Sequence, residues 1–269
     1  MPQSQLAVQM YTVRDHTKTA AAFAESLEKI AKIGYPAVQL SAVGAMNTPE
    51  GASKPEVDAR TVRQMLDDNG LKCIATHRSW DQLANRTDDE IAFHKELSCD
   101  YVAIGGIPGG YDRDSADAYR RFVEDSRPVI AKLKEAGIRF GHHNHAHEFQ
   151  RIAPDSPRTL WDILIDEGGP DYYLELDLYW AWHAGVDPAD LMRRCTGRVP
   201  VIHLKDKEVV AKDGPVMAPI GEGNLPWDSI IAACRDAGTE WYCVEQDVCR
   251  RDPFDCLRSS FEYLSSKGL

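Results

Sequence analysis

The sequence predicts one (β/α)₈ barrel that spans residues 1–269. Apolar, strand-like runs alternate with helix-like segments along the whole chain, as in a parallel sheet covered by helices. Helix-like segments end at Gly34, Gly70, Gly137 and Gly238, and an apolar run follows each glycine within a few residues. No glycine-rich turn follows the first apolar run, which disfavours an open dinucleotide-binding sheet.

The expected strands are rich in β-branched and aromatic residues and are bounded by polar residues or glycine. They cover residues 6–13, 36–42, 73–77, 101–106, 138–143, 172–180, 199–206 and 241–245. The eight units of strand and helix that these runs imply fit a closed barrel better than an open sheet.

The expected helices carry apolar residues at helical spacing. They cover residues 19–33, 86–98, 115–136, 157–167, 187–195, 226–237 and 254–267, and one more ends at Gly70. Pro128 is predicted to interrupt the helix over 115–136, because proline removes a helical hydrogen bond. Residues 43–58 show no periodicity, so we expect a loop over one end of the barrel.

The composition excludes several classes of protein. A formal net charge of −11 without a run of Lys and Arg disfavours nucleic acid as a partner. Seven cysteines without a CxxC pair indicate neither a disulfide framework nor a thiolate zinc site. Because no apolar segment is long enough to cross a membrane and no leader pattern opens the chain, we expect a cytoplasmic protein without a membrane partner.

Residues 141–149 hold four of the nine histidines, beside Asn144 and Glu148. Histidine ligates metals and exchanges protons near neutral pH, so this segment is the first candidate for a functional site. The simpler interpretation, hydrogen-bonded or solvated histidines at a strand end, holds better for any one of them than for the cluster.

Carboxylates and histidines also occur at the ends of the last three expected strands, where active sites of such barrels lie. Asp177, His203 and Glu245, with one further group from residues 141–149, would form a set of oxygen and nitrogen ligands. Such a set suits Mn²⁺, Mg²⁺, Co²⁺ or Zn²⁺, and manganese is favoured where carboxylates outnumber histidines. Buried ion pairs or solvated charges are the alternative for each residue taken alone.

Six motifs, distributed over the chain, give it a resemblance to a known family. They are QMYTVR at 9–14, HHNHAHEF at 142–149, LD at 176–177 with Trp180, HLKD at 203–206, GEG at 221–223 and VE at 244–245. With these motifs the chain resembles the xylose-isomerase-like barrel superfamily, in its branch of sugar phosphate isomerases and epimerases, near the tagatose epimerase and inosose dehydratase types.

This resemblance implies one divalent metal ion held by Glu, Asp, His and Glu. Asp177, His203 and Glu245 match the last three ligands. Many relatives carry the first glutamate directly on the strand, where this chain has histidines and an asparagine, so Glu148 is expected to complete the set. His143 and His145 are the competing candidates.

The resemblance also implies proton abstraction next to the metal-bound carbonyl of a keto-sugar or inosose, through an enediolate, in an isomerase or epimerase. The candidate bases are His145, His143 and Lys205, or Glu148 if it is not a ligand. Tyr11, His77, Trp80 and Trp180 are expected to form the wall of the carbohydrate pocket, although each tryptophan fits core packing as well.

The alternatives are a dehydratase or lyase acting on a 3-keto-sugar, inosose or 3-keto-glycoside, an apurinic endonuclease, and a non-catalytic sugar-binding or partner subunit. The acidic charge argues against the endonuclease. No phosphate-binding cradle is evident, which favours a free or glycosidic keto-sugar, and a homo-oligomer stays open.

Overall fold

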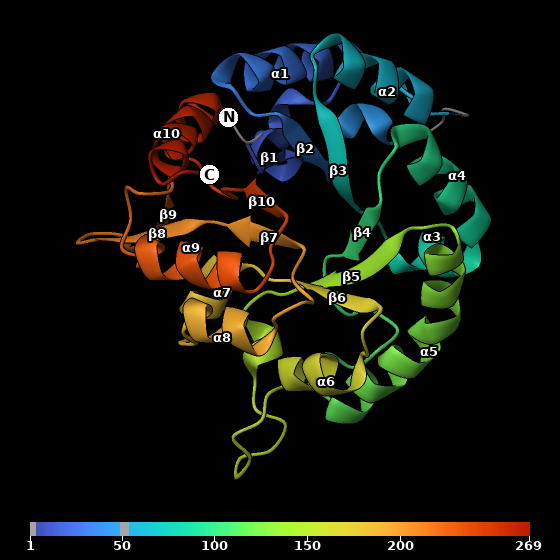
Figure 1. The fold of residues 1–269 in the computed structure, drawn as a ribbon, viewed down its shortest axis with the longest axis vertical. Coiled ribbons are helices and arrows are strands. Elements are labelled where there is room, and N and C mark those ends of the chain that lie inside the picture. Colours follow the sequence, from blue (N-terminus) through green and yellow to red (C-terminus); the bar gives the residue numbers. More distant parts are fainter. Residues whose placement is uncertain (1–3, 49–53) are drawn as a thin grey trace.

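The computed structural model describes residues 4–48 and 54–269, and its centre is a barrel of parallel strands (Figure 1). The strands lie in the order β6-β5-β4-β3-β2-β1-β10-β7, and a parallel bridge between Asp177 and His203 brings the two ends together. The predicted barrel is confirmed. The barrel strands are β1 (Leu6–Gln9), β2 (Ala37–Leu40), β3 (Lys72–His77), β4 (Tyr101–Ile104), β5 (Arg139–His143), β6 (Tyr172–Glu175), β7 (Val201–Leu204) and β10 (Trp241–Val244).

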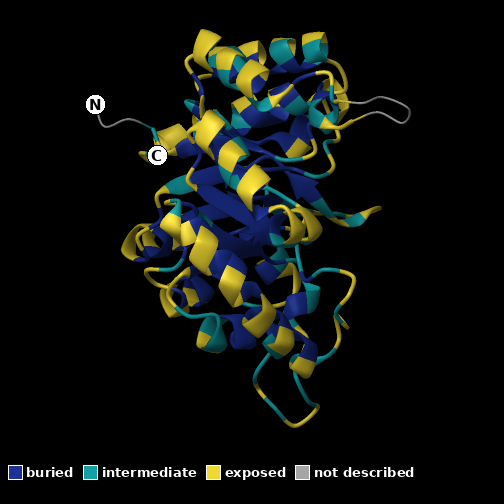
Figure 2. Cartoon of the chain, turned by 90° about the vertical axis from the view of Figure 1, so that its right-hand side faces the viewer, coloured by how far each residue is buried: buried dark blue, intermediate teal, exposed yellow. Residues whose placement is uncertain are grey.

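Helices surround the barrel and cover the outer face of the strands (Figures 1 and 2). They are α1 (Ala20–Ile33), α2 (Ala59–Asp68), α3 (Trp80–Asn85), α4 (Thr87–Leu97), α5 (Ala116–Glu135), α6 (Leu160–Glu167), α7 (Leu178–His183), α8 (Pro188–Arg194), α9 (Trp227–Asp236) and α10 (Pro253–Ser266). In the part of the chain that the structure describes, none of them is long and apolar enough to cross a bilayer.

One predicted helix interruption and two predicted strand ends are wrong for local reasons. Helix α5 runs through Pro128 without a break, because the ring lies on the exposed face, where water can reach the carbonyl that loses its helical donor. The strand predicted over 6–13 ends at Gln9, whose side chain accepts from the Tyr11 amide and starts a 3₁₀ turn (Met10–His16). The strand predicted over 172–180 ends at Glu175, because Asp177 caps helix α7.

Two further departures lie near the rim of the barrel. The loop expected over 43–58 contains a short 3₁₀ turn (Gly44–Met46), while residues 49–53 of that prediction lie outside the described residues. The strand predicted over 199–206 ends at Leu204. The chain then continues into an antiparallel hairpin of β8 (Asp206–Val210) and β9 (Gly214–Ala218).

The interior of the barrel is filled by a small layer of buried side chains. It contains Ala7, Ala37, Ile74, Ala75, Tyr101, Ala103, Tyr173, Val201 and Cys243. Gly141 of β5 makes room for the ring of Tyr173, since a Cβ at this glycine would lie 2.3 Å from Tyr173 Cζ. This layer closes the barrel beneath the carboxyl ends of the strands.

Candidate active site

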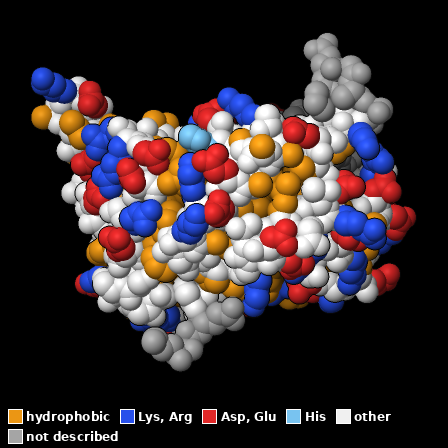
Figure 3. Space-filling model, turned by 90° about the horizontal axis from the view of Figure 1, so that it is seen from above, with side chains coloured by type: hydrophobic (Ala, Val, Ile, Leu, Met, Phe, Trp, Pro, Cys, Tyr) orange, Lys and Arg blue, Asp and Glu red, His pale blue; other side chains and the backbone are white. Residues whose placement is uncertain are grey.

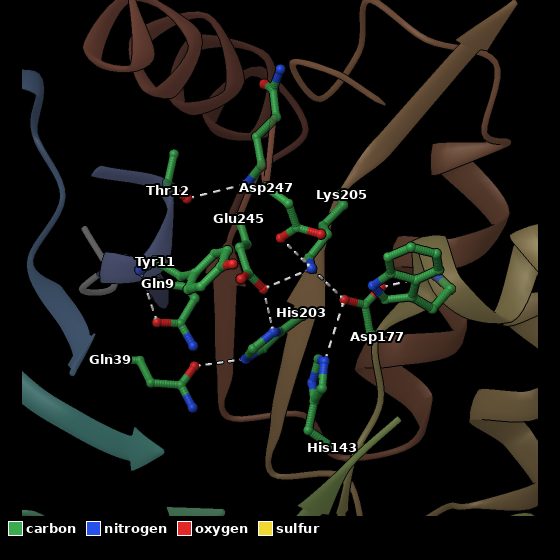
Figure 4. A network of polar contacts seen from close by, with 12 residues as sticks. Gln9, Tyr11, Thr12, Gln39, His143, Asp177, His203, Lys205, Glu245 and Asp247 are labelled. Carbon is green, nitrogen blue, oxygen red and sulfur yellow. Dashed lines mark hydrogen bonds and ion pairs between the residues drawn. The ribbon is translucent and has the colours of Figure 1, made fainter. Parts of the chain in front are cut away.

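Three side chains from β6, β7 and β10 converge at the carboxyl end of the barrel (Figure 4). Asp177 follows β6, His203 lies on β7 and Glu245 follows β10, and their ligand atoms lie within 4.8 Å of one another. His203 Nδ1 is 2.7 Å from Glu245 Oε2. Asp177 and His203 have no exposed surface, and Glu245 has 6%. The structure therefore brings together three of the four residues predicted to bind metal.

The position of Asp177 is fixed by its backbone. Asn144, just after β5, accepts from the Asp177 amide at 2.9 Å and donates to the Asp177 carbonyl at 3.2 Å. The Asp177 carboxylate in turn accepts from the Trp180 amide at 2.9 Å. Because the bond from the Trp180 amide uses Oδ1, the other carboxylate oxygen, Oδ2, stays directed toward His203 and Glu245.

His143 of β5 lies beside this group. Its Nε2 is 3.8 Å from Asp177 Oδ2, and its Nδ1 is 3.7 Å from Glu175 Oε2. Burial and the neighbouring His203 and His77 hold the pKa of His143 well below its ordinary value, so its imidazole is neutral at neutral pH.

Glu175, which was not among the predicted site residues, contacts several polar side chains next to His203. It is fully buried, accepts from Gln39 Nε2 at 2.6 Å and forms a very short contact with His77. Gln39 also contacts His203 Nε2 at 2.7 Å. Glu175 is the last residue of β6 and Asp177 stands two positions beyond it, so the two side chains share a face; this spacing is the sequence signal that would have identified Glu175.

Lys205 is buried among carboxylates. Its Nζ lies 3.0 Å from Asp177 Oδ2, 3.0 Å from Glu245 Oε2 and 2.8 Å from Asp247 Oδ1. Burial lowers the pKa of Lys205, but the three carboxylates outweigh burial and raise it, so the ammonium is charged. Burial and Glu245 raise the pKa of Asp247 to about 6. Among the described residues, Lys205 forms no ion pair with Asp206, the residue next to it in the sequence.

Glu148 is not with the other predicted ligands. It is fully buried, but its ligand atom groups with His145 and His147 rather than with Asp177, His203 and Glu245. The 3₁₀ turn His147–Phe149 reverses the chain after β5, and Glu148 Oε2 accepts from the His145 amide at 2.7 Å.

A cavity of about 380 Å³ opens above the buried group. Most of the predicted pocket and catalytic residues line it: Tyr11, His77, His143, His145, Trp180 and Lys205, with Glu245 and Asp247. Trp80 instead lines a neighbouring cavity of about 440 Å³ and packs edge-on against Phe122 and Phe140. A third cavity, of about 570 Å³, shares Gly105, His145 and Trp180 with the first.

Comparison with known protein families identifies the family of this barrel. The family model of the xylose isomerase-like TIM barrel matches residues 27–266. The chain belongs to this family. The resemblance found in the sequence is thereby confirmed, and the family includes proteins named for different reactions.

Curated relatives and solved structures show this variety. The chain is 32% identical over 165 residues to a probable endonuclease 4 of Mycobacterium bovis, covering 56% of this chain and 61% of the relative. It therefore spans about three-fifths of that relative's length. A sugar phosphate isomerase/epimerase of Parabacteroides distasonis superposes with a TM-score of 0.80 at 20% identity, covering 99% of this chain and 95% of the other. An L-ribulose 3-epimerase gives a TM-score of 0.72 at 13% identity, covering 98% and 94%. These structural likenesses show the fold.

The endonuclease relatives leave the exclusion of nucleic acid as a prediction. On the face shown in Figure 3, described Lys and Arg side chains are interspersed with Asp and Glu and do not form a continuous basic patch. The net charge of −11 adds to this argument.

Proposed function

We propose that the chain is a divalent-metal-dependent isomerase or epimerase that acts on a keto-sugar or inosose by removing a proton next to its carbonyl. The observation that carries this proposal is the buried convergence of Asp177, His203 and Glu245, of which Glu245 also lines a cavity open to solvent. Three protein ligands beside such a cavity would leave coordination positions for a substrate, as in catalytic metal sites.

The donor set fits a divalent ion. Asp177 Oδ2, His203 Nδ1 and Glu245 Oε2 are buried and lie close to one another, and the Lys205 ammonium lies 3.0 Å from both carboxylate oxygens. Two carboxylates and one imidazole suit Mn²⁺ as well as Zn²⁺, Co²⁺ or Mg²⁺. When bound, the ion would act as a Lewis acid that polarises the substrate carbonyl. Glu148 lies outside this set, so the proposed ligands are the other three.

The remaining groups have protonation states that suit proton transfer. His143 lines the cavity as a neutral imidazole, and Glu175 near its Nδ1 favours a proton on that nitrogen, which leaves Nε2 free to accept one. Lys205 carries a charged ammonium beside the same cavity and can donate to a developing oxyanion. We therefore propose His143 as the base, and Lys205 as the cation that stabilises charge.

A second candidate is a dehydratase or lyase acting on the same kind of substrate. The cavity of about 570 Å³ that shares His145 and Trp180 with the first cavity favours it, because a leaving group needs space beside the reacting carbon. The protonated form of Asp247, whose pKa is about 6, would serve as a general acid only in mildly acidic solution.

One experiment separates the two reactions. The manganese-loaded protein is incubated in D₂O with D-fructose, an inosose and a 3-keto-glucoside, and products are followed by NMR. Deuterium entering beside the carbonyl, without loss of water or aglycone, supports the isomerase or epimerase, and elimination supports the lyase.

Asp177→Asn should abolish the reaction together with the ion bound by Asp177, His203 and Glu245, while Asp190→Asn, an exposed aspartate on α8, should leave both unchanged. Activity that persists after chelation, in protein shown by elemental analysis to be metal-free, would refute the metal-dependent mechanism.

A further inference from the structure

The cluster formed by His145, His147 and Glu148 is separate from the three proposed ligands at the cavity floor. Its ligand atoms also lie within 4.8 Å of one another, and it shares no residue with the group Asp177, His203 and Glu245. It lies where the chain turns back after β5, and all three residues fall within four consecutive positions.

Glu148 is an unusual carboxylate in this cluster. The residue has no exposed surface, and one oxygen is held by the His145 amide. The other oxygen, Oε1, has no hydrogen-bond partner among the described residues. His147 Nε2 lies 3.1 Å from Oε1, but the angle does not make a hydrogen bond, and Nε2 lacks any other partner in the same part of the chain.

A carboxylate oxygen and an imidazole nitrogen that are buried side by side without a hydrogen bond are costly, because each has lost water without gaining a hydrogen bond in return. A cation between them would remove this cost. No Lys or Arg side chain forms an ion pair with Glu148 among the described contacts, and the basic side chain recorded within 4.0 Å of it is that of His147. Gly106 lies beside this oxygen without a side chain of its own, and a Cβ built on it would be 3.7 Å from Oε1.

We propose that His145, His147 and Glu148 form a second metal site, which binds a divalent transition-metal ion. Two imidazoles and one carboxylate suit Zn²⁺ or Co²⁺ better than Mg²⁺ or Ca²⁺, which prefer oxygen ligands. The three residues would hold the ion beside the cavity of about 570 Å³, which His145 and His147 line, and three protein ligands would leave coordination positions for a ligand.

The two sites lie close together. The rings of His143 and His145 pack edge to face with centroids 4.9 Å apart, and His145 lines both cavities. An ion at the second site would therefore face the part of a ligand that extends beyond the first cavity. The ligand groups that it would hold are oxygen atoms, such as hydroxyl or carboxylate groups.

The test is the zinc content of variants, measured by elemental analysis after dialysis against Zn²⁺ and removal of excess metal. The wild type should retain two ions per chain, Asp177→Asn one, Glu148→Gln one, and the variant with both substitutions none. His147→Gln, on a half-exposed side chain, should reproduce the loss seen in Glu148→Gln and guards against misfolding of the buried variant. His183→Gln, at an exposed histidine on α7, is the control and should retain both ions.

Cobalt substitution gives a second measure. The visible absorption of Co²⁺ in Asp177→Asn should report ligation by nitrogen, and it should disappear on adding Glu148→Gln. The proposal is overturned if Glu148→Gln and His147→Gln keep the wild-type content, or if Asp177→Asn alone removes all zinc. Loss of an ion from Glu148→Gln but not from Asp177→Asn would support this site while refuting the metal ligands of the proposed function.

Discussion

Replacing Asp206 should destabilise the protein strongly, although this residue lies outside the cavity. Its carboxylate accepts from the amides of Lys207, Gly221, Gly223 and Leu225 and from Trp227 Nε1, at 2.7–3.2 Å. These bonds tie the hairpin that follows β7 to the loop before α9. Gly223 approaches so closely that a Cβ there would lie 2.2 Å from Asp206 Oδ1.

The magnitude follows from which donors water can reach. The bonds from Leu225 N and Trp227 Nε1 are buried, whereas the other three are partly exposed and can be rehydrated. A hydrogen bond to a charged acceptor contributes about 1.5–3 kcal/mol. Loss of the two buried bonds in Asp206→Ala should therefore lower the free energy of unfolding by roughly 3–6 kcal/mol. Asp206→Asn should also be destabilised, because either orientation of its amide turns an NH₂ group toward at least two N–H donors.

Equilibrium urea unfolding, followed by far-UV circular dichroism and tryptophan fluorescence, measures this difference. Asp213→Asn, an exposed aspartate at the tip of the same hairpin, is the control and should change stability by less than about 0.5 kcal/mol. If Asp206→Ala unfolds within about 1 kcal/mol of the wild type, the bonds to the loop do not have the strength that their burial implies.

Three other predictions concern metal binding, pH and DNA. Glu175→Gln should weaken manganese binding by about 10–100-fold in competition with a chromophoric chelator, because Glu175 and Gln39 orient His203 from its other nitrogen; unchanged affinity would contradict this role. Burial lowers the pKa of His142 from 6.5 to about 4. As the pH falls, the unfolded chain therefore binds a proton at this histidine before the folded chain does. The wild type should therefore lose about 3 kcal/mol of stability between pH 6.5 and pH 4 that a His142→Asn variant does not lose, and equal pH slopes in urea unfolding would refute this. Fluorescence anisotropy with a duplex that contains an abasic site should show a Kd weaker than about 100 μM at physiological salt; tighter, salt-dependent binding would restore the endonuclease alternative.

Much of the architecture could be predicted from local patterns. Helices that end in glycine before apolar runs predicted the barrel, because a helix end of this kind depends on backbone conformation within a few residues. Strand ends were harder. Asp177 is both a candidate ligand and the cap of α7, and a short apolar run such as residues 172–180 does not distinguish a strand from a strand followed by a helix.

The site was predictable to the extent that it follows strand alternation. Asp177, His203 and Glu245 lie where neighbouring strands end, so their convergence follows from the barrel itself. Glu148 lies within a 3₁₀ turn, and the direction of a side chain in such a turn depends on contacts that sequence spacing does not reveal. The pairing of Lys205 with Asp177, Glu245 and Asp247 rather than with Asp206 reflects the opposite directions of adjacent side chains along a strand.

The ring of Tyr173, seated against Gly141, has a kinetic consequence. Because it closes the barrel from below, the proposed ion and a ligand would both enter through the cavity near Asp177, His203 and Glu245. The order of entry and exit would then be fixed: the ion, which is bound deeper, would arrive first and leave last. A bound ligand should block the exit of the ion. Chelators should then remove the ion more slowly as the ligand concentration rises, even when the ligand does not touch the ion.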